Sequence, residues 1–227
     1  MRVSVVLPVR NGELYLAEAI ESVLSNTLPP WELIVVDDGS TDGTPEVIQR
    51  FPAIRSIRQE ASGACSARNR GLALCTGDLV AFQDADDIWM PNKLELQVAA
   101  LKREPGLAGV FGSVVQFYQG AEAEEQPQPA WLLACLLARR ALFEKVGLFD
   151  PQYRLGEFID WCLRSQEMGF RYGMVPEVVL RRRLHPSNLG RTLRENRQDY
   201  ARIVMAALQR RKANAKSADG SDFPRID

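Results

Sequence analysis

The stretch Leu79-Val80-Ala81-Phe82-Gln83-Asp84-Ala85-Asp86-Asp87 joins a short apolar run directly to three carboxylates. A continuous apolar run of this length is typical of a strand that is covered on both faces, as in a parallel sheet. In open α/β sheets, ligands bind beyond the carboxyl ends of the strands, which is where these acids would stand. Asp84 and Asp86 are separated by one residue, so a bend after the strand can turn both toward one ion.

The Asp-x-Asp pattern favours a divalent cation site at this strand end. Carboxylate oxygens suit Mg²⁺ or Mn²⁺, which proteins commonly bind through one or two carboxylates together with phosphate oxygens of a substrate. A second interpretation stays open at this point, because a solvated acidic loop that also caps the helix beginning near Pro91 would have the same composition. The neighbouring strands help to decide between the two.

Two earlier apolar runs also end in polar residues. The run Val3 to Pro8 leads into Val9-Arg10-Asn11-Gly12, and the run Glu32 to Val36 leads into Asp37-Asp38-Gly39-Ser40. Segments with helical spacing separate these runs, which predicts βαβ units and a parallel sheet. All three polar loops are therefore expected on one edge of the sheet. Two acidic clusters at neighbouring strand ends predict a binding site there.

The rest of the chain alternates further predicted elements. Helices are predicted over residues 13–24, 43–50, 63–74, 91–103, 140–146, 157–168 and 192–211. Further strands are predicted over residues 54–58, 109–118, 131–137, 172–175 and 178–183. Asn11 can cap the first helix. The polar residues 120–129 are predicted to form a mobile loop, and residues 213–227 a disordered tail.

The overall composition is that of an ordinary globular protein. The chain has 227 residues, of which 46% are hydrophobic and 25% charged, and no linker is long enough to separate independent domains. The net charge of −1 does not by itself identify a partner. No nucleic-acid partner is expected.

Three further features bear on the cellular compartment. Val3 to Pro8 is too short for the apolar region of a signal peptide, and Ala130 to Ala138 falls short of the roughly 20 residues that a membrane span needs. The cysteines are scattered without a Cys-x-x-Cys pattern, which is typical of buried thiols in a reducing compartment. These cysteines are Cys65, Cys75, Cys135 and Cys162. We therefore expect a cytoplasmic protein.

Residues 191–212 are predicted to form a basic C-terminal helix. From Arg181 to Lys212 the chain carries ten lysines and arginines and only two acids. Two interpretations stay open. The helix can contact a partner surface such as anionic lipid at the membrane periphery, or its apolar face can pack back onto the domain. The residues concerned are Tyr200, Ile203, Val204, Ala207 and Leu208, surrounded by Arg194, Arg197, Arg202 and Arg210.

Five blocks stand in a fixed order along the sequence. They are Val5-Val6-Leu7-Pro8-Val9-Arg10-Asn11, Leu33-Ile34-Val35-Val36-Asp37-Asp38-Gly39-Ser40-Thr41-Asp42, Ala67-Arg68-Asn69-Arg70-Gly71, Asp84-Ala85-Asp86-Asp87 with Pro91, and Val146-Gly147-Leu148-Phe149-Asp150. Together they strongly resemble glycosyltransferase family 2, the inverting nucleotide-sugar glycosyltransferases with the GT-A fold. The resemblance runs from Val3 to about Asn188.

The resemblance implies an α/β fold, a GT-A (Rossmann-like) single domain with a mostly parallel central sheet flanked by helices. The domain would span residues 1–190, with residues 1–110 as the nucleotide-binding half and residues 111–190 as the acceptor half. The implied reaction moves a sugar from a nucleotide sugar, expected to be a UDP-sugar, to an unidentified acceptor hydroxyl. The residues implied to bind the nucleotide are Pro8, Val9, Arg10, Asn11, Asp38, Arg68, Asp84 and Asp86.

Within this set the resemblance implies separate roles. Asp38 would accept a hydrogen bond from the base, and Arg68 would face the base or the diphosphate. Asp84 would meet the ribose or a metal. Asp86 would bind the Mn²⁺ or Mg²⁺ ion that bridges the two phosphates and neutralises the leaving diphosphate. Asp37 is interpreted as a turn-forming aspartate.

His185 is the only histidine of the chain, in a basic stretch after a predicted strand. The resemblance implies that it reaches the metal or the diphosphate, so the implied metal residues are Asp86, Asp84 and His185. A histidine in a basic loop can also be merely exposed. Of the arginines in Arg181-Arg182-Arg183, some would pair with diphosphate and some would face solvent, because alternate strand residues point to opposite sides.

The catalytic base is the least defined part of the site. Inverting transfer needs a carboxylate to take the acceptor proton. The family commonly supplies it from a Glu-Asp pair at the start of a helix, but here Phe158 stands in the place of the aspartate. Glu157 and Asp160 lie three residues apart on that helix, so either is a candidate, and Asp160 is slightly favoured. Their structural alternatives are stabilisation of the helix N-terminus and an ion pair with Arg164.

Two other functions remain open on the sequence. A nucleotidyltransferase would have a similar α/β architecture, but it would want a glycine-rich basic loop after the first strand, and Val9-Arg10-Asn11-Gly12 is poor in glycine. A pseudo-enzyme or scaffold that binds a nucleotide sugar would explain Phe158 as the lost base. A dinucleotide-binding dehydrogenase is disfavoured, because no Gly-x-Gly-x-x-Gly follows the first strand.

Overall fold

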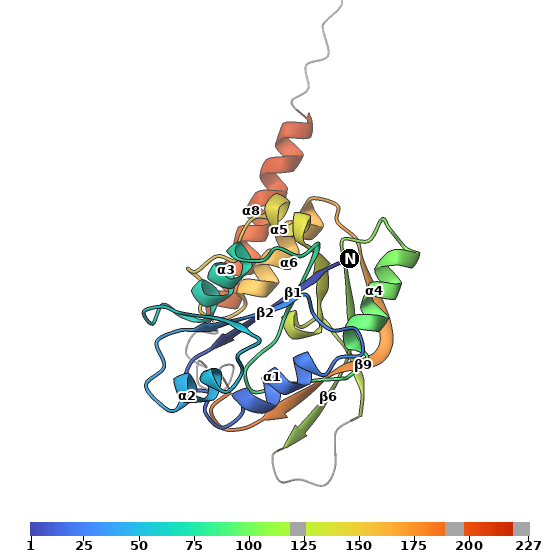
Figure 1. The fold of residues 1–227 in the computed structure, drawn as a ribbon. Helices are drawn as coiled ribbons and strands as arrows, with labels where there is room; N and C mark the ends of the chain where they lie inside the picture. The colour runs from blue at the N-terminus through green and yellow to red at the C-terminus, as the bar shows by residue number, and fades with distance from the viewer. Residues whose placement is uncertain (119–125, 189–197, 220–227) are drawn as a thin grey trace, which may run out of the picture.

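The structure, a computed structural model, describes residues 1–118, 126–188 and 198–219 (Figure 1). Its strands are β1 (Val3–Val9), β2 (Glu32–Asp37), β3 (Arg55–Arg58), β4 (Leu79–Phe82), β5 (Ile88–Trp89), β6 (Gly109–Tyr118), β7 (Gln128–Ala130), β8 (Leu137–Arg139) and β9 (Tyr172–Leu184). Its helices are α1 (Leu16–Leu24), α2 (Thr44–Gln49), α3 (Ala64–Ala73), α4 (Lys93–Arg103), the 3₁₀ turn η1 (Leu133–Cys135), α5 (Arg140–Val146), α6 (Glu157–Glu167) and α8 (Gln198–Asp219).

The strands of the described residues form one sheet in the order β3-β2-β1-β4-β8-β6-β9-β5, with β7 paired to β6. β3, β2, β1 and β4 are parallel neighbours, as the sequence predicted. β8 then pairs antiparallel with both β4 and β6, and β6 and β9 are parallel to each other. The single α/β domain therefore has a parallel part and a mixed part, joined at β8.

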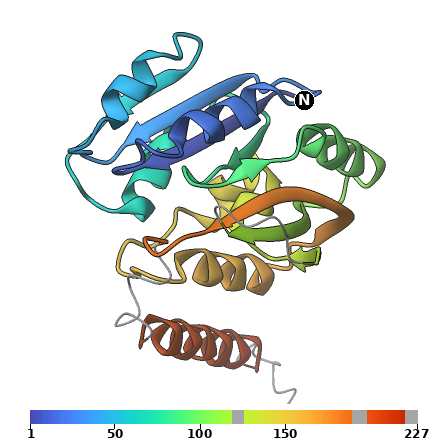
Figure 2. The ribbon, with the colours of Figure 1, turned by 90° about the horizontal axis from the view of Figure 1, so that it is seen from below.

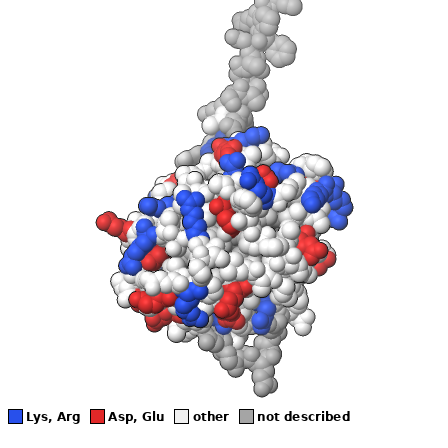
Figure 3. All heavy atoms as spheres, viewed as in Figure 1, with Lys and Arg blue, Asp and Glu red and all other residues white. Residues whose placement is uncertain are grey.

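The core follows from the apolar runs. Every residue of β1 is buried, as expected of a strand covered on both faces. α3 packs on β1 and β2, and α4 packs on β6, β8 and β9. Gly71 lets α3 approach the sheet, because a Cβ there would lie 2.4 Å from Val6 Cγ1. On the outer surface, the face in Figure 3 carries acidic and basic side chains interspersed.

The prediction of a strand over residues 131–137 was wrong. Leu133–Cys135 form a 3₁₀ turn beneath β4, β6 and β9, and the strand β8 begins only at Leu137. Trp131 is 57% exposed. The run is apolar because it is buried under the sheet, and a short apolar run does not distinguish a strand from other buried backbone.

The two short strands predicted between residues 172 and 183 are one strand, β9. Its pairing with β6 moves from Phe111↔Met174 to Ser113↔Val178, so the chain bulges at Pro176. A bulge accommodates a proline, which has no N–H to donate to the ladder. Of the loop predicted over residues 120–129, residues 128 and 129 belong to β7, and residues 119–125 lie outside the described residues.

Asn11 does not cap the first helix, which begins at Leu16 after a turn at residues 13–15. Its backbone has φ 53°, and its Oδ1 accepts a hydrogen bond from the N–H of Thr41 at 2.9 Å. Asn11 therefore ties the loop after β1 to the loop after β2. Asparagine tolerates this left-handed conformation better than most residues.

The C-terminal helix extends further than the sequence predicted. α8 runs to Asp219, so residues 213–219 are helical and do not form a disordered tail, whereas residues 189–197 and 220–227 lie outside the described residues. α8 packs against α6 on the outside of the molecule (Figure 2). In the part of the chain that the structure describes, no helix combines the length and apolar character needed to cross a bilayer.

Candidate active site

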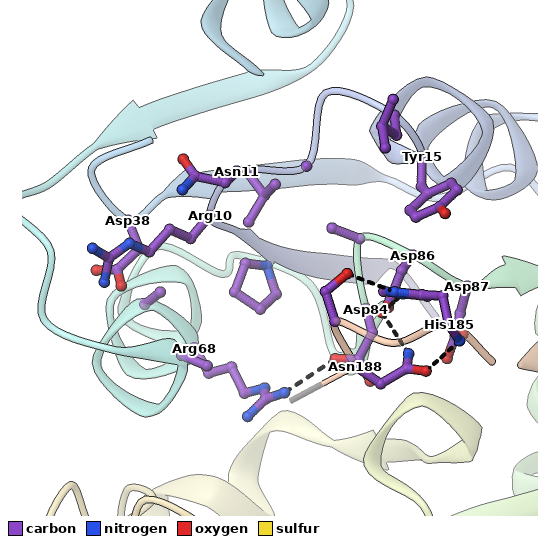
Figure 4. Close-up of a pocket in the computed structure, with 18 of the residues that line it drawn as sticks. Arg10, Asn11, Tyr15, Asp38, Arg68, Asp84, Asp86, Asp87, His185 and Asn188 are labelled. Carbon is purple, nitrogen blue, oxygen red and sulfur yellow. Dashed lines mark hydrogen bonds and ion pairs between the residues drawn. The ribbon is translucent and has the colours of Figure 1, made fainter. Parts of the chain in front are cut away.

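A cavity of about 490 Å³ opens beyond the carboxyl ends of β1, β2 and β4 (Figure 4). The three polar loops predicted to share this edge do meet there, and they are joined by the end of β9 and the start of α3. The sequence-predicted residues that line the cavity are Pro8, Val9, Arg10, Asn11, Asp38, Arg68, Asp84, Asp86 and His185. Glu157 and Asp160 do not line it.

The acidic loop after β4 sends its carboxylates to different partners. Asp84 Oδ1 accepts from Arg68 Nη2 at 3.0 Å. Asp86 Oδ2 lies 2.9 Å from His185 Nε2 and accepts from Asn188 Nδ2 at 3.1 Å. Ser187 Oγ lies 2.9 Å from the other ring nitrogen of His185, so the imidazole is held at both nitrogens. His185 is therefore a fixed member of the site, with a side chain 10% exposed.

Asp87 is the buried carboxylate of this loop. It is 4% exposed, and its Oδ1 accepts from the backbone N–H of Arg183 at 2.8 Å. Burial, together with the negative charges of Asp84 and Asp86, raises the pKa of Asp87 well above its usual value. The loop thus places three carboxylates close enough to disfavour one another's charge.

The two aspartates after β2 organise backbone. Asp37 Oδ1 accepts from the N–H of Ser40 at 2.8 Å, which confirms the turn-forming interpretation. Both oxygens of Asp38 accept from backbone N–H groups, of Ser62 and of Gly63, each at 2.8 Å. Asp38 therefore fixes the turn that begins α3, and it reaches the cavity from a position that is only 2% exposed.

Arg68 connects the acidic loop after β4 with the start of α6. Its guanidinium pairs with Asp84 after β4 and with Glu157 at the first turn of α6. Burial lowers the pKa of Arg68, but the charges of Asp84 and Glu157 more than offset this, and the pKa is raised. Glu157 therefore lies one side chain behind the cavity wall, held by an arginine that lines it.

Asp160 points elsewhere. Its Oδ2 accepts from Arg164 Nε at 2.8 Å, and its Oδ1 accepts from Arg210 Nη1 of α8 at 3.3 Å. Its side chain is 3% exposed. The slight preference for Asp160 as the base is not supported by this geometry, and the ion pair with Arg164 that was its structural alternative is present. Phe158 is buried beside Phe111 and Trp161.

Some residues of the cavity were missed by sequence reasoning. Asn188 was not predicted as a site residue, yet it lines the cavity and donates a hydrogen bond to Asp86. Tyr15 also lines the cavity, and its ring lies 5.0 Å from that of His185. The sequence feature that could have identified Asn188 is its position three residues after His185. One turn of the chain brings residues at this spacing close together.

The acidic loop is a candidate divalent cation site. Among the described residues, no group of three or more His, Cys, Asp or Glu side chains is arranged to hold a metal ion. Mg²⁺ and Mn²⁺ do not require such a cage, because substrate phosphates and water complete their coordination. The hard carboxylate oxygens of Asp84 and Asp86 and the mutual repulsion of the carboxylates in this loop fit an ion of this kind.

Comparison with known proteins gives a consistent result. The family model described as glycosyl transferase family 2 matches residues 4–216. The putative teichuronic acid biosynthesis glycosyltransferase TuaG of Bacillus subtilis is 43% identical over 101 residues, 42% of this chain and 40% of that protein. The Escherichia coli protein WfgD, described as UDP-Glc:alpha-D-GlcNAc-diphosphoundecaprenol beta-1,3-glucosyltransferase, is 41% identical over 102 residues, 44% of this chain and 40% of that protein.

Among solved structures, Staphylococcus aureus TarS 1–349 in complex with UDP superposes with a TM-score of 0.69 at 21% identity, over 82% of this chain and 61% of that chain. At this identity the likeness concerns the fold, and it confirms the expected GT-A fold. The matched stretches span two fifths of the two curated relatives and less than two thirds of the TarS chain.

Proposed function

The chain belongs to glycosyl transferase family 2, and from this premise we propose that it is an inverting glycosyltransferase that moves a sugar from a nucleotide-sugar donor to an acceptor hydroxyl with the help of a divalent cation. The observation that carries the proposal is the convergence of the loops after β1, β2 and β4 with His185 around one cavity. Metal-assisted transfer from a nucleoside diphosphate needs a charged cleft of this kind beside a second, acceptor-facing wall.

The donor is proposed to be a UDP-sugar. TarS, which shares the fold, is described in complex with UDP, and WfgD is described as using UDP-Glc. In this chain, Arg10 and Arg68 bring positive charge to the cavity where the diphosphate would bind. Asp38 would act at the base end. Because both of its oxygens already accept backbone N–H groups, it would also shape the turn beneath the base.

The cation is proposed to be Mn²⁺ or Mg²⁺, held by Asp86 with Asp84 and His185. When bound, such an ion would stabilise the charge of the departing nucleoside diphosphate. Asn188 and His185 orient the Asp86 carboxylate through Oδ2. Arg68 orients Asp84. Residues that fix a ligand in this way usually matter nearly as much as the ligand itself.

Glu157 is proposed as the general base, with Asp160 as the weaker candidate. Glu157 begins α6 and reaches Arg68, which lines the cavity, whereas Asp160 is paired with Arg164 and with Arg210 of α8. Donor binding would draw Arg68 toward the diphosphate and leave the Glu157 carboxylate able to accept the acceptor proton. A base of this kind typically contributes a factor of roughly 10²–10⁴.

Calorimetric titration with UDP tests the metal-dependent donor site directly. We expect binding in the presence of Mn²⁺ or Mg²⁺ and at least tenfold weaker binding with EDTA, the lower end of what is lost when a metal site is disturbed. Asp86→Ala should abolish the metal dependence. Asp78→Ala is the matched control, because Asp78 stands at the opposite end of β4, where it accepts from the N–H of Arg2. Equal affinity with and without metal would remove the cation from the proposal.

A second candidate, a donor-binding protein without turnover, is favoured by one observation. Phe158 occupies the place of the usual aspartate and is packed into the core beside Phe111 and Trp161. A screen of UDP-sugars for metal-dependent hydrolysis separates the two candidates. UDP binding without hydrolysis, and without transfer to any acceptor tried, would favour the donor-binding protein.

A peripheral membrane contact is proposed for the outer face of α8. The description of WfgD names alpha-D-GlcNAc-diphosphoundecaprenol, a sugar linked to a long apolar polyprenyl chain. On α8, Ile203 and Ala207 are buried against the domain, whereas Val204, Met205 and Leu208 are exposed. Co-sedimentation with vesicles of anionic lipid, compared with neutral vesicles, tests this contact. Absence of vesicle binding at low salt would contradict the proposed membrane contact.

A further inference from the structure

α8 holds the helix that carries the proposed base. It packs along α6 on the outer side of the domain (Figure 2). The face turned toward the domain includes Ile203 and Ala207, which are at most 5% exposed. More than 40 residues of chain separate the starts of these helices, so the pairing is a tertiary feature.

The first turn of α8 contacts the turn that starts α6. Asp199 is 2% exposed, and its Oδ2 accepts from the backbone N–H groups of Arg154 at 2.9 Å and Leu155 at 3.2 Å. The next residue, Gly156, has φ +83° and precedes Glu157 at the start of α6. A Cβ on Gly156 would lie 2.9 Å from Ile203 Cδ1, so α8 leaves this turn no room to shift outward.

Ion pairs of Arg210 hold a second part of the interface between α6 and α8. Arg210 Nε donates to Glu167 Oε2 at 2.7 Å and Arg210 Nη1 donates to Asp160 Oδ1 at 3.3 Å, and both acceptors are on α6. Burial lowers the pKa of Arg210, but these two carboxylates more than offset it, and the pKa is raised. With Asp199 at one end and Arg210 at the other, α6 is held against both sliding and rotation.

We propose that Asp199 is a positioning residue for the reaction: through the N–H groups of Arg154 and Leu155 it fixes the Gly156 turn, so that Glu157 faces Arg68 and the donor cavity. The proposal rests on the proposed function of Glu157. Asp199 itself does not line the cavity, and the bonds that its carboxylate makes among the described residues go to Arg154, Leu155 and Arg202. A displacement of about 1 Å in a catalytic group can cost up to a hundredfold in rate.

The test compares three variants of the full chain. Asp199→Ala removes the acceptor, Asp199→Asn keeps one side-chain oxygen for the two N–H groups, and Gln209→Ala changes an exposed residue of the same helix. We expect Asp199→Ala to lower kcat for transfer or donor hydrolysis roughly tenfold to a hundredfold, with UDP affinity unchanged. Asp199→Asn should recover most of this loss, and Gln209→Ala should behave as the parent.

Hydrogen exchange measured on peptides that cover residues 154–160 adds a readout independent of turnover. Exchange there should quicken in Asp199→Ala and return toward the parent rate in Asp199→Asn. Parent-like kcat in Asp199→Ala despite faster exchange would overturn the proposal, as would equal losses of kcat and UDP affinity, which would indicate general unfolding. If Asp199→Ala does not fold, Ile203→Val loosens the same contact more gently and should lower kcat while sparing UDP affinity. The parent's own UDP binding and turnover report separately on the proposed function.

Discussion

The parallel part of the sheet, β3-β2-β1-β4, and the mixed part, β8-β6-β9-β5, use acidic residues in opposite ways. In the parallel part, Asp84 and Asp86 stand at a strand end with side chains 39% and 29% exposed to the cavity. Beside the mixed part, Asp160 is 3% exposed and is neutralised by Arg164 and Arg210. The first arrangement leaves charge available to a ligand, and the second uses charge to join helices.

The difference follows from how each part is built. Parallel strands bring successive loops to one edge, so polar residues gather there without packing against one another. α6 and α8 meet along their sides, where an acid must either be paired or be absent. An acidic residue next to the parallel part is therefore a candidate for binding, whereas one between α6 and α8 is a candidate for stability.

Removing one acid from each side tests this contrast most strongly. Asp160→Ala should lower the free energy of unfolding by about 1–3 kcal/mol, because Arg164 and Arg210 would lose a buried charged acceptor that they share. Asp86→Ala should change it by less than about 1 kcal/mol, since that side chain faces the cavity and repels Asp87. Urea denaturation of both variants measures the difference. Equal losses would break the comparison.

Lys93 gives the contrast of a buried charge whose ammonium faces the Trp89 ring, 4.9 Å from its centroid, in place of a carboxylate. It is fully buried, its Nζ has no hydrogen-bond partner among the described residues, and burial lowers its pKa to about 8. The unfolded chain keeps this proton up to about pH 10.5. The contribution of Lys93 to the free energy of unfolding therefore rises with pH between about 8 and 10.5. At pH 7, the substitution Lys93→Met should therefore raise the free energy of unfolding by about 3 kcal/mol.

The gain from Lys93→Met should shrink to nothing above about pH 10.5, where lysine is neutral in both states of the parent. Burial raises the pKa of the four cysteine thiols to about 12, which lowers stability as the pH rises above about 9. Parent and variant share this loss, so the difference between them isolates Lys93. Urea midpoints at pH 7 and pH 10.5 provide the measurement. A constant difference would mean that Lys93 does not titrate in this range.

Isosteric substitution sharpens the comparison for catalysis. Glu157→Gln should lower turnover roughly a hundredfold, the usual contribution of a general base, and leave UDP affinity within a few-fold of the parent. Asp160→Asn is the matched control on the same helix. It should lose stability but keep its turnover per folded molecule. If Asp160→Asn instead loses turnover and Glu157→Gln keeps it, the base is Asp160 and the division of roles is wrong.

The smallest expected effect concerns the backbone at the edge of the parallel part. Asn11 has φ 53°, a conformation that costs alanine about 1–2 kcal/mol and glycine almost nothing. Asn11→Ala and Asn11→Gly both lose the bond to the N–H of Thr41, so their difference reports the strain alone. Asn11→Ala should be about 1 kcal/mol less stable than Asn11→Gly. Equal urea midpoints would show that the loop relaxes freely.

The sequence identified the parallel part and its loops because both are local properties. An apolar run followed by acids, as in Leu79 to Asp87, marks a buried strand and its end. The alternation with helices then determines which strand ends share an edge. His185 was found through the family resemblance, and the structure shows it beside Asp86.

Only the tertiary structure decided what lies between α6 and the cavity. Glu157 and Asp160 are three residues apart and equivalent by sequence, but in the structure one pairs with Arg68 and the other with Arg164 and Arg210. The contacts that hold α6 in this position include Asp199, Ile203 and Arg210 of α8, far along the chain. Periodicity determines which residues share a helix face, whereas the direction of that face depends on what packs against it.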